Sequence, residues 1–281
     1  MTVETTILLD GLTLPECPRW RNNKLWFSNI WARQIMTVDL AGNSETVATL
    51  PSYPFGLGWM PNDQLLAVSG LERKLLRPSY EELVMIADMS EIEQFSCNDM
   101  VISKQGWAYI GATGFDFLGN QPFAQGKLIL ATPDGMARVV ASEMDFPNGL
   151  VITPDGKTII VAETFGGRLT AFDLTSDGSL VNRRVWAQIN GRTPDGICLD
   201  AEGAVWVASP QSGEVIRVLE GGEITHHVQA TNIPFACMLG GSDRCTLFVL
   251  TSATHEPEKA RALKSGRIET VQVKVSGAGL P

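Results

Sequence analysis

The sequence predicts an all-β protein, a six-bladed β-propeller formed by residues 1–281 as a single domain. Three observations predict this fold. Short apolar runs of strand length dominate the chain, helical periodicity is scarce, and a six-residue pattern occurs six times. Its copies lie about 40 to 50 residues apart, which is the spacing of propeller blades.

The strands are predicted from apolar runs that are bounded by Gly, Asp, Asn or Pro. They include KLWFSNI, QLLAVSG, WAYIGAT, TIIVAET, AVWVASP and TLFVLTS. The segments TPDGK (153–157) and DAEGA (200–204) have the composition of tight turns that join consecutive strands. This pattern is typical of antiparallel sheets.

The repeated hexapeptide marks the start of each predicted blade, where we expect a short loop to lead into a strand. Its copies are PECPRW (15–20), PFGLGW (54–59), CNDMVI (97–102), PNGLVI (147–152), PDGICL (194–199) and PFACML (234–239). Five of the six begin with proline. A β-sandwich does not need such a recurrence and a β-solenoid has a shorter period, so the propeller is favoured.

The two ends of the chain also contain strand-like segments. TTILLDG (5–11) near the start and RIETVQVKV (267–275) near the end are predicted to complete the same blade. Such a pairing would close the ring and remove two exposed sheet edges.

The composition disfavours several classes of partner. The formal net charge is -9 and no Lys/Arg cluster occurs, so binding to nucleic acid or an anionic membrane is disfavoured. The chain has no 18-residue apolar stretch and no signal-peptide pattern. Its five cysteines include no C-x-x-C pair and are interpreted as reduced thiols. We therefore expect a cytoplasmic protein with a small-molecule substrate, and its oligomeric state stays open.

The second residue of each hexapeptide is predicted to face the central channel, because equivalent positions of the blades surround the propeller axis. Four of these six residues carry oxygen, two as carboxylates and two as carboxamides. This set suits a hard cation, with Ca²⁺ favoured and Mg²⁺, Mn²⁺ or Zn²⁺ as alternatives. The six residues are Glu16, Phe55, Asn98, Asn148, Asp195 and Phe235.

Turn preference is the competing explanation for Asn and Asp at these positions. It does not account for Glu16, because glutamate has no special preference for turns. Zinc is less favoured, since the three histidines lack ligand spacing and the cysteines are scattered. The sequence therefore predicts a central metal site formed by Glu16, Asn98, Asn148 and Asp195.

Four segments resemble the senescence-marker-protein/gluconolactonase/luciferin-regenerating-enzyme-like family, which includes regucalcin, bacterial gluconolactonases and diisopropyl fluorophosphatase. They are PECPRW, CNDMVISKQGWAYIGATGF, FPNGLVITPDGKTIIVAET and RTPDGICLDAEGAVWVAS. The resemblance implies a six-bladed propeller with a catalytic divalent cation. It places Glu16, Asn148 and Asp195 at the family's metal-ligand positions and implies that Asp195 is the acid/base or nucleophilic carboxylate. Asn98 matches an asparagine that contacts the metal or the substrate.

Three departures from the family pattern concern the substrate. Ser96 stands where sugar-lactonase members have an arginine that contacts substrate. Asp116, in the aromatic segment TGFDFLGNQPF, aligns with a substrate-contacting acid of regucalcin-like members. Cys17 replaces a usual glycine. These changes favour an apolar or aromatic lactone over a sugar lactone and leave the four predicted ligands intact.

The leading hypothesis is metal-dependent hydrolysis of a lactone, with Asp195 as the catalytic carboxylate. The expected substrate-binding residues are Asn98, Asp116, Ser96, Phe115, Phe55, Phe235 and His255. Trp31, Trp59 and Phe117 are further candidates for the channel wall, although at least half of the aromatic candidates are expected to pack between blades. The alternatives are hydrolysis of an organophosphate or aryl ester at the same site, and a non-catalytic calcium-binding propeller. No G-x-S-x-G or nucleotide-binding motif occurs.

Overall fold

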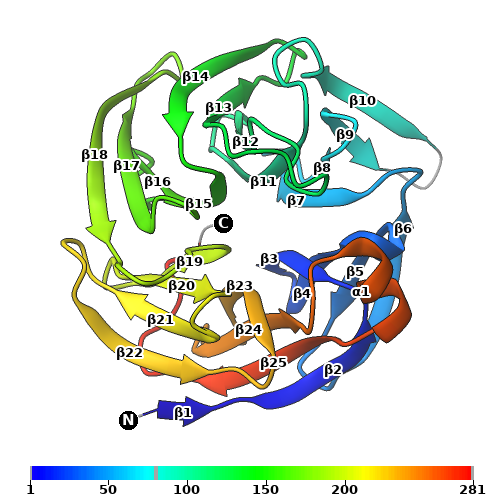
Figure 1. Ribbon diagram of the computed structural model, residues 1–281, viewed down its shortest axis with the longest axis vertical. Coiled ribbons are helices and arrows are strands. Elements are labelled where there is room, and N and C mark those ends of the chain that lie inside the picture. The colour runs from blue at the N-terminus through cyan, green and yellow to red at the C-terminus, as the bar shows by residue number, and fades with distance from the viewer. Residues whose placement is uncertain (1, 79–81, 280–281) are drawn as a thin grey trace.

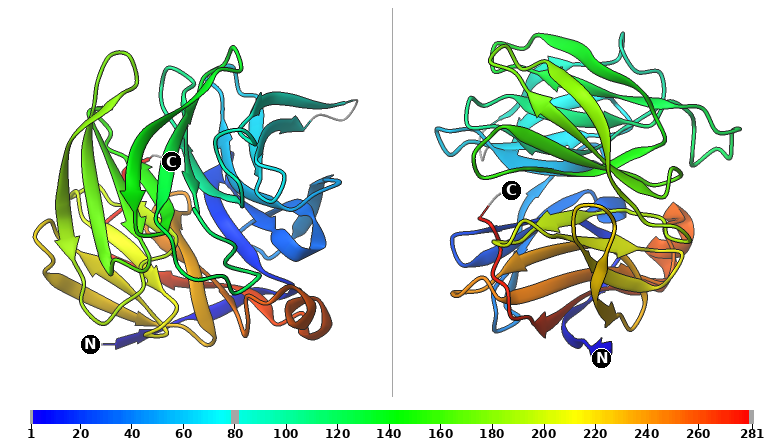
Figure 2. Two further views of the ribbon diagram at one scale, coloured as in Figure 1. Left: turned by 45° about the horizontal axis from the view of Figure 1, so that its top comes forward. Right: turned by 90° about the vertical axis from the view of Figure 1, so that its left-hand side faces the viewer.

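The computed structural model describes residues 2–78 and 82–279, which form six sheets around a central axis (Figure 1). The sheets are twisted and stand side by side around the ring (Figure 2). In the first five blades, four consecutive strands run from the centre to the rim. The predicted six-bladed propeller is therefore confirmed.

The first three blades each contain four strands. The first consists of β3 (Pro15–Arg21), β4 (Lys24–Asn29), β5 (Gln34–Val38) and β6 (Ser44–Thr49). The second consists of β7 (Pro54–Trp59), β8 (Leu65–Ser69), β9 (Lys74–Pro78) and β10 (Leu83–Asp88). The third consists of β11 (Cys97–Ile102), β12 (Ala108–Ala112), β13 (Gly126–Ala131) and β14 (Ala137–Met144).

The last three blades include the strands from the N-terminus. The fourth consists of β15 (Pro147–Ile152), β16 (Thr158–Glu163), β17 (Arg168–Leu174) and β18 (Leu180–Gln188). The fifth consists of β19 (Ile197–Leu199), β20 (Val205–Ser209), β21 (Glu214–Val218), β22 (Ile224–Gln229) and β1 (Thr2–Glu4). The sixth consists of β23 (Ile233–Gly240), β24 (Thr246–Ser252), β25 (Gly266–Gln272) and β2 (Thr6–Leu12).

The ring is closed by strands from both ends of the chain, as predicted. β2 pairs antiparallel with β25, so the sixth blade combines the two ends. β1 pairs parallel with β22 of the fifth blade, which the sequence analysis did not predict. The N-terminal segment therefore covers the outer edges of two neighbouring blades.

Two short helices interrupt the β-structure of the described residues. The 3-10 helix η1 (Ile30–Ala32) follows β4, and the α-helix α1 (Pro257–Leu263) lies between β24 and β25. The sequence analysis did not identify α1, although it begins with Pro257 and has Arg261 in its last turn, both ordinary helix signals. Neither helix in the described ranges is long and apolar enough to cross a membrane.

The hexapeptides form the innermost strands themselves in five blades. The interpretation of each hexapeptide as a loop before a strand is therefore wrong for these five. In the fifth blade, residues 194–196 precede β19. Asn98 and Asn148 lie within β11 and β15, so turn preference does not explain their positions. The segments TPDGK and DAEGA form the predicted turns.

A β-bulge lies near the start of five innermost strands. The pairing register shifts between Pro147 and Leu150 in β15 and between Cys97 and Met100 in β11, with similar shifts in β3, β7 and β23. A bulge changes the direction in which a side chain points and ends regular pairing locally. In these five blades, the second residue of the hexapeptide lies at or next to this irregularity.

The glycine of the hexapeptide permits close approach between neighbouring innermost strands. A Cβ atom on Gly149 would lie 2.6 Å from the Ile197 nitrogen, and one on Gly56 would lie 2.5 Å from the Met100 nitrogen. Neither glycine has a positive φ, so close approach rather than turn geometry requires them. The Gly149 amide also donates to the Asp195 carbonyl oxygen, at 3.2 Å.

Candidate metal and substrate site

One cavity of about 900 Å³ lies at the end of the channel where the innermost strands begin. All six hexapeptide positions line it, as the repeat predicts: Glu16, Phe55, Asn98, Asn148, Asp195 and Phe235. At the other end of β19, the Ala278 amide of the C-terminal segment donates to the Leu199 carbonyl oxygen. Residues far apart in the sequence thus share one wall because they occupy equivalent positions in the blades.

Two carboxylates line this cavity: Asp195 is buried and Glu16 is partly buried. Burial, and then the nearby Asp195 carboxylate, raise the pKa of Glu16 well above its usual value. Burial, with a contribution from the Asp99 charge, raises the pKa of Asp195 to about 8. Hydrogen bonds from the Asn148 side chain and the Gly196 amide lower the pKa of Asp195, but by less than burial raises it. A bound cation would remove much of the electrostatic cost of ionising both groups.

A buried ion pair lies next to these carboxylates. Arg19 donates to an Asp99 oxygen at 2.8 Å, and both side chains are almost fully buried. The same guanidinium also donates to the Pro18 and Met100 carbonyl oxygens. Sequence reasoning missed this pair, although Asp99 directly follows Asn98 in its hexapeptide. The Arg19 charge lowers the pKa of Glu16 only as the smallest of several influences, and the pKa of Glu16 stays raised.

Cys17 also lies beside the carboxylates, within β3. Its φ of +51° is in the left-handed region, which is less strained for glycine than for any other residue. This explains why glycine is usual at this position in the resembled family. Burial raises the pKa of the Cys17 thiol well above its usual value. The thiol therefore stays protonated and is a poor nucleophile. All five cysteines of the chain are free.

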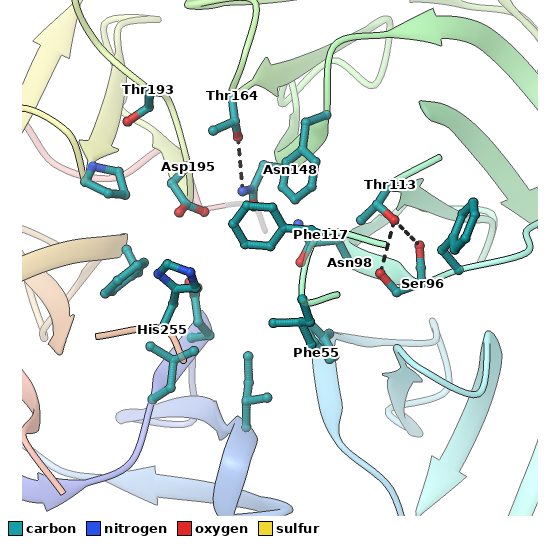
Figure 3. A pocket seen from close by; sticks show the side chains of 18 of the residues that line it. Phe55, Ser96, Asn98, Thr113, Phe117, Asn148, Thr164, Thr193, Asp195 and His255 are labelled. Carbon is teal, nitrogen blue, oxygen red and sulfur yellow. Dashed lines mark hydrogen bonds between the residues drawn. The ribbon is translucent and has the colours of Figure 1, made fainter. Parts of the chain in front are cut away.

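The Asn148 amide is held by a neighbouring hydroxyl. Asn148 Nδ2 donates to Thr164 Oγ1 at 3.2 Å, and Thr164 Oγ1 donates to the Pro194 carbonyl oxygen at 2.8 Å. Figure 3 shows Thr164, Asn148 and Asp195 together at one side of the cavity. Sequence reasoning did not select Thr164, which lies outside the hexapeptides.

Ser96, Asn98 and Thr113 form the neighbouring part of the wall (Figure 3). The Ser96 and Thr113 hydroxyls lie 3.1 Å apart, and Thr113 also donates to the Phe115 carbonyl oxygen. Asn98 lines the cavity, and no hydrogen bond from its side chain to another described residue is found. Its amide is therefore available to a cation or a substrate.

The loop between β12 and β13 reaches across the mouth of the cavity. Phe117 in this loop contacts the His255 ring, with centroids 5.3 Å apart, although these residues belong to opposite blades. Asp116 lines the cavity, but its carboxylate accepts a hydrogen bond from the Gly119 amide and stabilises the loop. Phe115 does not line the cavity. Its side chain is buried and packs edge-to-face against the Phe117 ring.

The opposite wall is also aromatic. Trp31 lines the cavity and donates its indole N–H to the His255 carbonyl oxygen at 2.9 Å. Desolvation lowers the pKa of His255, so its imidazole is neutral at pH 7. Trp59 lies away from the cavity and packs edge-to-face on Trp26. Phe146 and Phe165 line the cavity as well, and sequence reasoning did not select them.

The donors in the cavity fit a hard divalent cation. Glu16 and Asp195 supply two carboxylates, and Asn98 and Asn148 supply two amide oxygens, a combination typical of Ca²⁺ sites. In the described ranges, no group of three or more His, Cys, Asp and Glu side chains is placed to hold a metal. A cation here would therefore need the two amide oxygens as well as the carboxylates.

Curated proteins with similar sequences include two kinds of relative. The chain is 26% identical over 282 residues to 6-deoxy-6-sulfogluconolactonase of Pseudomonas putida, which covers 95% of this chain and 94% of the relative. It is 30% identical over 258 residues to regucalcin of Homo sapiens, covering 86% of this chain and 84% of the relative.

Solved structures share the fold at lower identity. A calcium-binding protein, regucalcin, from Agrobacterium tumefaciens matches with a TM-score of 0.83 and 21% identity, covering 100% of this chain and 98% of that chain. A gluconolactonase from Xanthomonas campestris matches with a TM-score of 0.76 and 21% identity, covering 95% and 89%. The family model described as the SMP-30/Gluconolactonase/LRE-like region matches residues 14–254. The chain therefore belongs to the SMP-30/gluconolactonase/LRE-like family.

Proposed function

We propose that this protein is a divalent-metal-dependent hydrolase that opens a lactone, with Ca²⁺ as the favoured ion. One observation carries the proposal: two carboxylates, one buried and one partly buried, and two carboxamides, each from a different blade, line a single cavity. Membership of a family that includes gluconolactonases supports lactone hydrolysis in general. The metal dependence and the choice of ion rest on the donor set.

The proposed chemistry assigns a different task to each group. A bound divalent cation would polarise the lactone carbonyl and stabilise the negative charge that develops on its oxygen. Asp195 accepts a proton from the attacking water or delivers one to the departing alkoxide. Glu16, Asn98 and Asn148 hold the ion.

The walls of the cavity favour an uncharged, apolar or aromatic lactone. No described residue that lines the cavity is Lys or Arg, so an anionic substituent would have no positively charged side chain to bind. The Pseudomonas putida relative is named for a sulfonated substrate, and we infer that this chain acts on a different one. Ser96 supplies only a hydroxyl at the position where the resemblance places an arginine.

A panel of lactones after chelation and re-addition of Ca²⁺, Mg²⁺, Mn²⁺ or Zn²⁺ tests the proposal. We expect the chelated protein to be inactive and Ca²⁺ to restore hydrolysis, with alkyl and aryl lactones turned over faster than gluconolactone. Activity that survives complete chelation would contradict the metal dependence. Faster hydrolysis of gluconolactone would contradict the substrate preference but leave the hydrolase assignment intact.

A second candidate function is calcium binding without catalysis. It is favoured by the similarity to the Agrobacterium tumefaciens protein described as calcium-binding and by the four oxygen-bearing side chains. Tight Ca²⁺ binding without turnover of any lactone, aryl ester or organophosphate in the panel would support this alternative. In either case we propose a small molecule or ion as the partner, with no nucleic acid or membrane, and a cytoplasmic location.

A further inference from the structure

We propose that Thr164 is a positioning residue for the metal site, whose hydroxyl fixes the orientation of the Asn148 amide and holds the segment that carries Asp195. This inference rests on the proposed metal site. Thr164 lies outside the six hexapeptides, so the repeat does not identify it.

The backbone holds Thr164 beside the start of β15. Thr164 directly follows β16, and its amide donates to the Phe146 carbonyl oxygen at 3.1 Å. Its hydroxyl oxygen then lies 3.2 Å from Asn148 Nδ2 and 2.8 Å from the Pro194 carbonyl oxygen. One hydroxyl therefore connects a proposed ligand of the fourth blade to the residue before a proposed ligand of the fifth.

The number of protons on this hydroxyl determines the orientation of the amide. A carbonyl oxygen can only accept, so the single hydroxyl proton of Thr164 points to Pro194. The Thr164 oxygen then offers only lone pairs to Asn148, which must present its NH₂ group to it. The Asn148 oxygen consequently lies on the other side of the amide, where it is free to bind a cation.

The opposite orientation of this amide would be costly in two ways. The Asn148 oxygen would face the lone pairs of Thr164, and the NH₂ group, which cannot ligate a cation, would take the place of the ligand oxygen. Asn148 is only 7% exposed, so water cannot easily replace the missing hydrogen bond. Partners of this kind commonly change metal affinity by about 10- to 100-fold.

Thr113 is the equivalent residue of the third blade and supplies a matched control. It directly follows β12, and its amide donates to the Ser96 carbonyl oxygen at 2.9 Å, as the Thr164 amide does to Phe146. It also lines the cavity. Its hydroxyl, however, bonds to Ser96 and Phe115 and makes no hydrogen bond to the neighbouring ligand Asn98.

The test is calorimetric titration of Ca²⁺ into the metal-free full chain for the wild type, Thr164→Val, Thr164→Ser and Thr113→Val. We expect Thr164→Val to bind Ca²⁺ about 10-fold or more weakly. Thr164→Ser keeps the hydroxyl and should bind close to wild type, and Thr113→Val should also keep its affinity. Thermal unfolding in chelator, measured in parallel, reports whether each variant folds.

The outcomes separate this inference from the proposed function. A folded Thr164→Val that binds Ca²⁺ as tightly as wild type overturns the positioning role alone. Equal weakening in Thr164→Val and Thr164→Ser also overturns it, because the hydroxyl would then not be responsible. A wild-type chain that binds none of Ca²⁺, Mg²⁺, Mn²⁺ and Zn²⁺ overturns the metal site itself, and this inference with it.

Discussion

Asp195 is proposed both as a metal ligand and as the acid/base group, and these roles make opposite demands on its carboxylate. A nearby cation lowers the pKa of a carboxyl group and makes it a weaker base. Burial and the Asp99 charge raise the pKa of Asp195 in the metal-free protein. The two influences oppose each other, so a buried carboxylate among other acids can bind a cation and still keep useful basicity.

Replacement of Asp195 by Asn tests its part in the reaction. Asparagine has a similar shape and keeps one oxygen for the cation, but it cannot accept the proton. We expect the turnover number at saturating Ca²⁺ to fall by about 10²- to 10⁴-fold. The measurement is lactone hydrolysis together with the content of bound metal. Wild-type turnover with metal retained would contradict the base assignment.

At the level of elements, the loop between β12 and β13 and the innermost strands determine the shape of the site. The loop brings Phe117 into contact with His255 across the mouth of the cavity. The innermost strands lie close together because of their glycines. Under the proposed function, the loop would limit which substrates fit, while the strands determine where the proposed ligands lie.

Removal of the Phe117 ring is expected to weaken the binding of aromatic lactones. An aromatic contact contributes about 1 kcal/mol, so Phe117→Ala should raise the KM for an aryl lactone roughly fivefold. The KM for a small alkyl lactone should change less. Phe123→Ala is the control, because Phe123 belongs to the same loop and contacts Phe115 and Phe165 without lining the cavity. Equal effects of both variants would argue against a direct contact.

A methyl group at Gly149 is expected to separate two innermost strands. The new Cβ atom would lie 2.6 Å from the Ile197 nitrogen, so β15 must move away from the segment that carries Asp195. Gly149→Ala should cost about 1–3 kcal/mol of stability and weaken Ca²⁺ binding. Gly156→Asn is the control, because this turn position has open space and a positive φ that asparagine tolerates. Unchanged stability and affinity in Gly149→Ala would show that close approach is not required.

At the scale of the whole molecule, closing the ring brings charges of the same sign together. Glu16, Asp99 and Asp195 come from the first, third and fifth blades, and their interactions raise the pKa values of Glu16 and Asp195. In the unfolded chain Glu16 and Asp195 are far apart, and both titrate near their usual values. Folding without a cation therefore has an electrostatic cost that depends on pH.

The metal-free protein should lose stability from this site as the pH rises from about 4 to about 8. Below this range Asp195 is protonated in both the folded and the unfolded chain. Within it, the unfolded chain has released the proton while the folded chain keeps it, so rising pH favours unfolding. In chelator, Asp195→Asn should therefore unfold at a higher temperature than wild type, by a margin that grows between pH 5 and pH 8. Saturating Ca²⁺ should abolish this advantage. A margin that is independent of pH would contradict the raised pKa.

The sequence by itself determined the propeller, its closure by the two chain ends and the six positions that surround the channel. These features follow from local patterns and from a repeat, because equivalent positions of similar blades must meet at one axis. The family also follows from motifs within single blades, and the match over residues 14–254 confirms it.

Only the tertiary structure decided how these residues are held. It places Asn98 and Asn148 within strands, assigns the glycines to close packing, and removes Phe115 and Trp59 from the wall. It also reveals Thr164 and the Arg19–Asp99 pair. These contacts join different blades or loops, and the side chains that make them do not occupy equivalent positions in the repeat. No periodicity along the chain therefore predicts them. Only the folded ring brings these side chains within hydrogen-bonding distance.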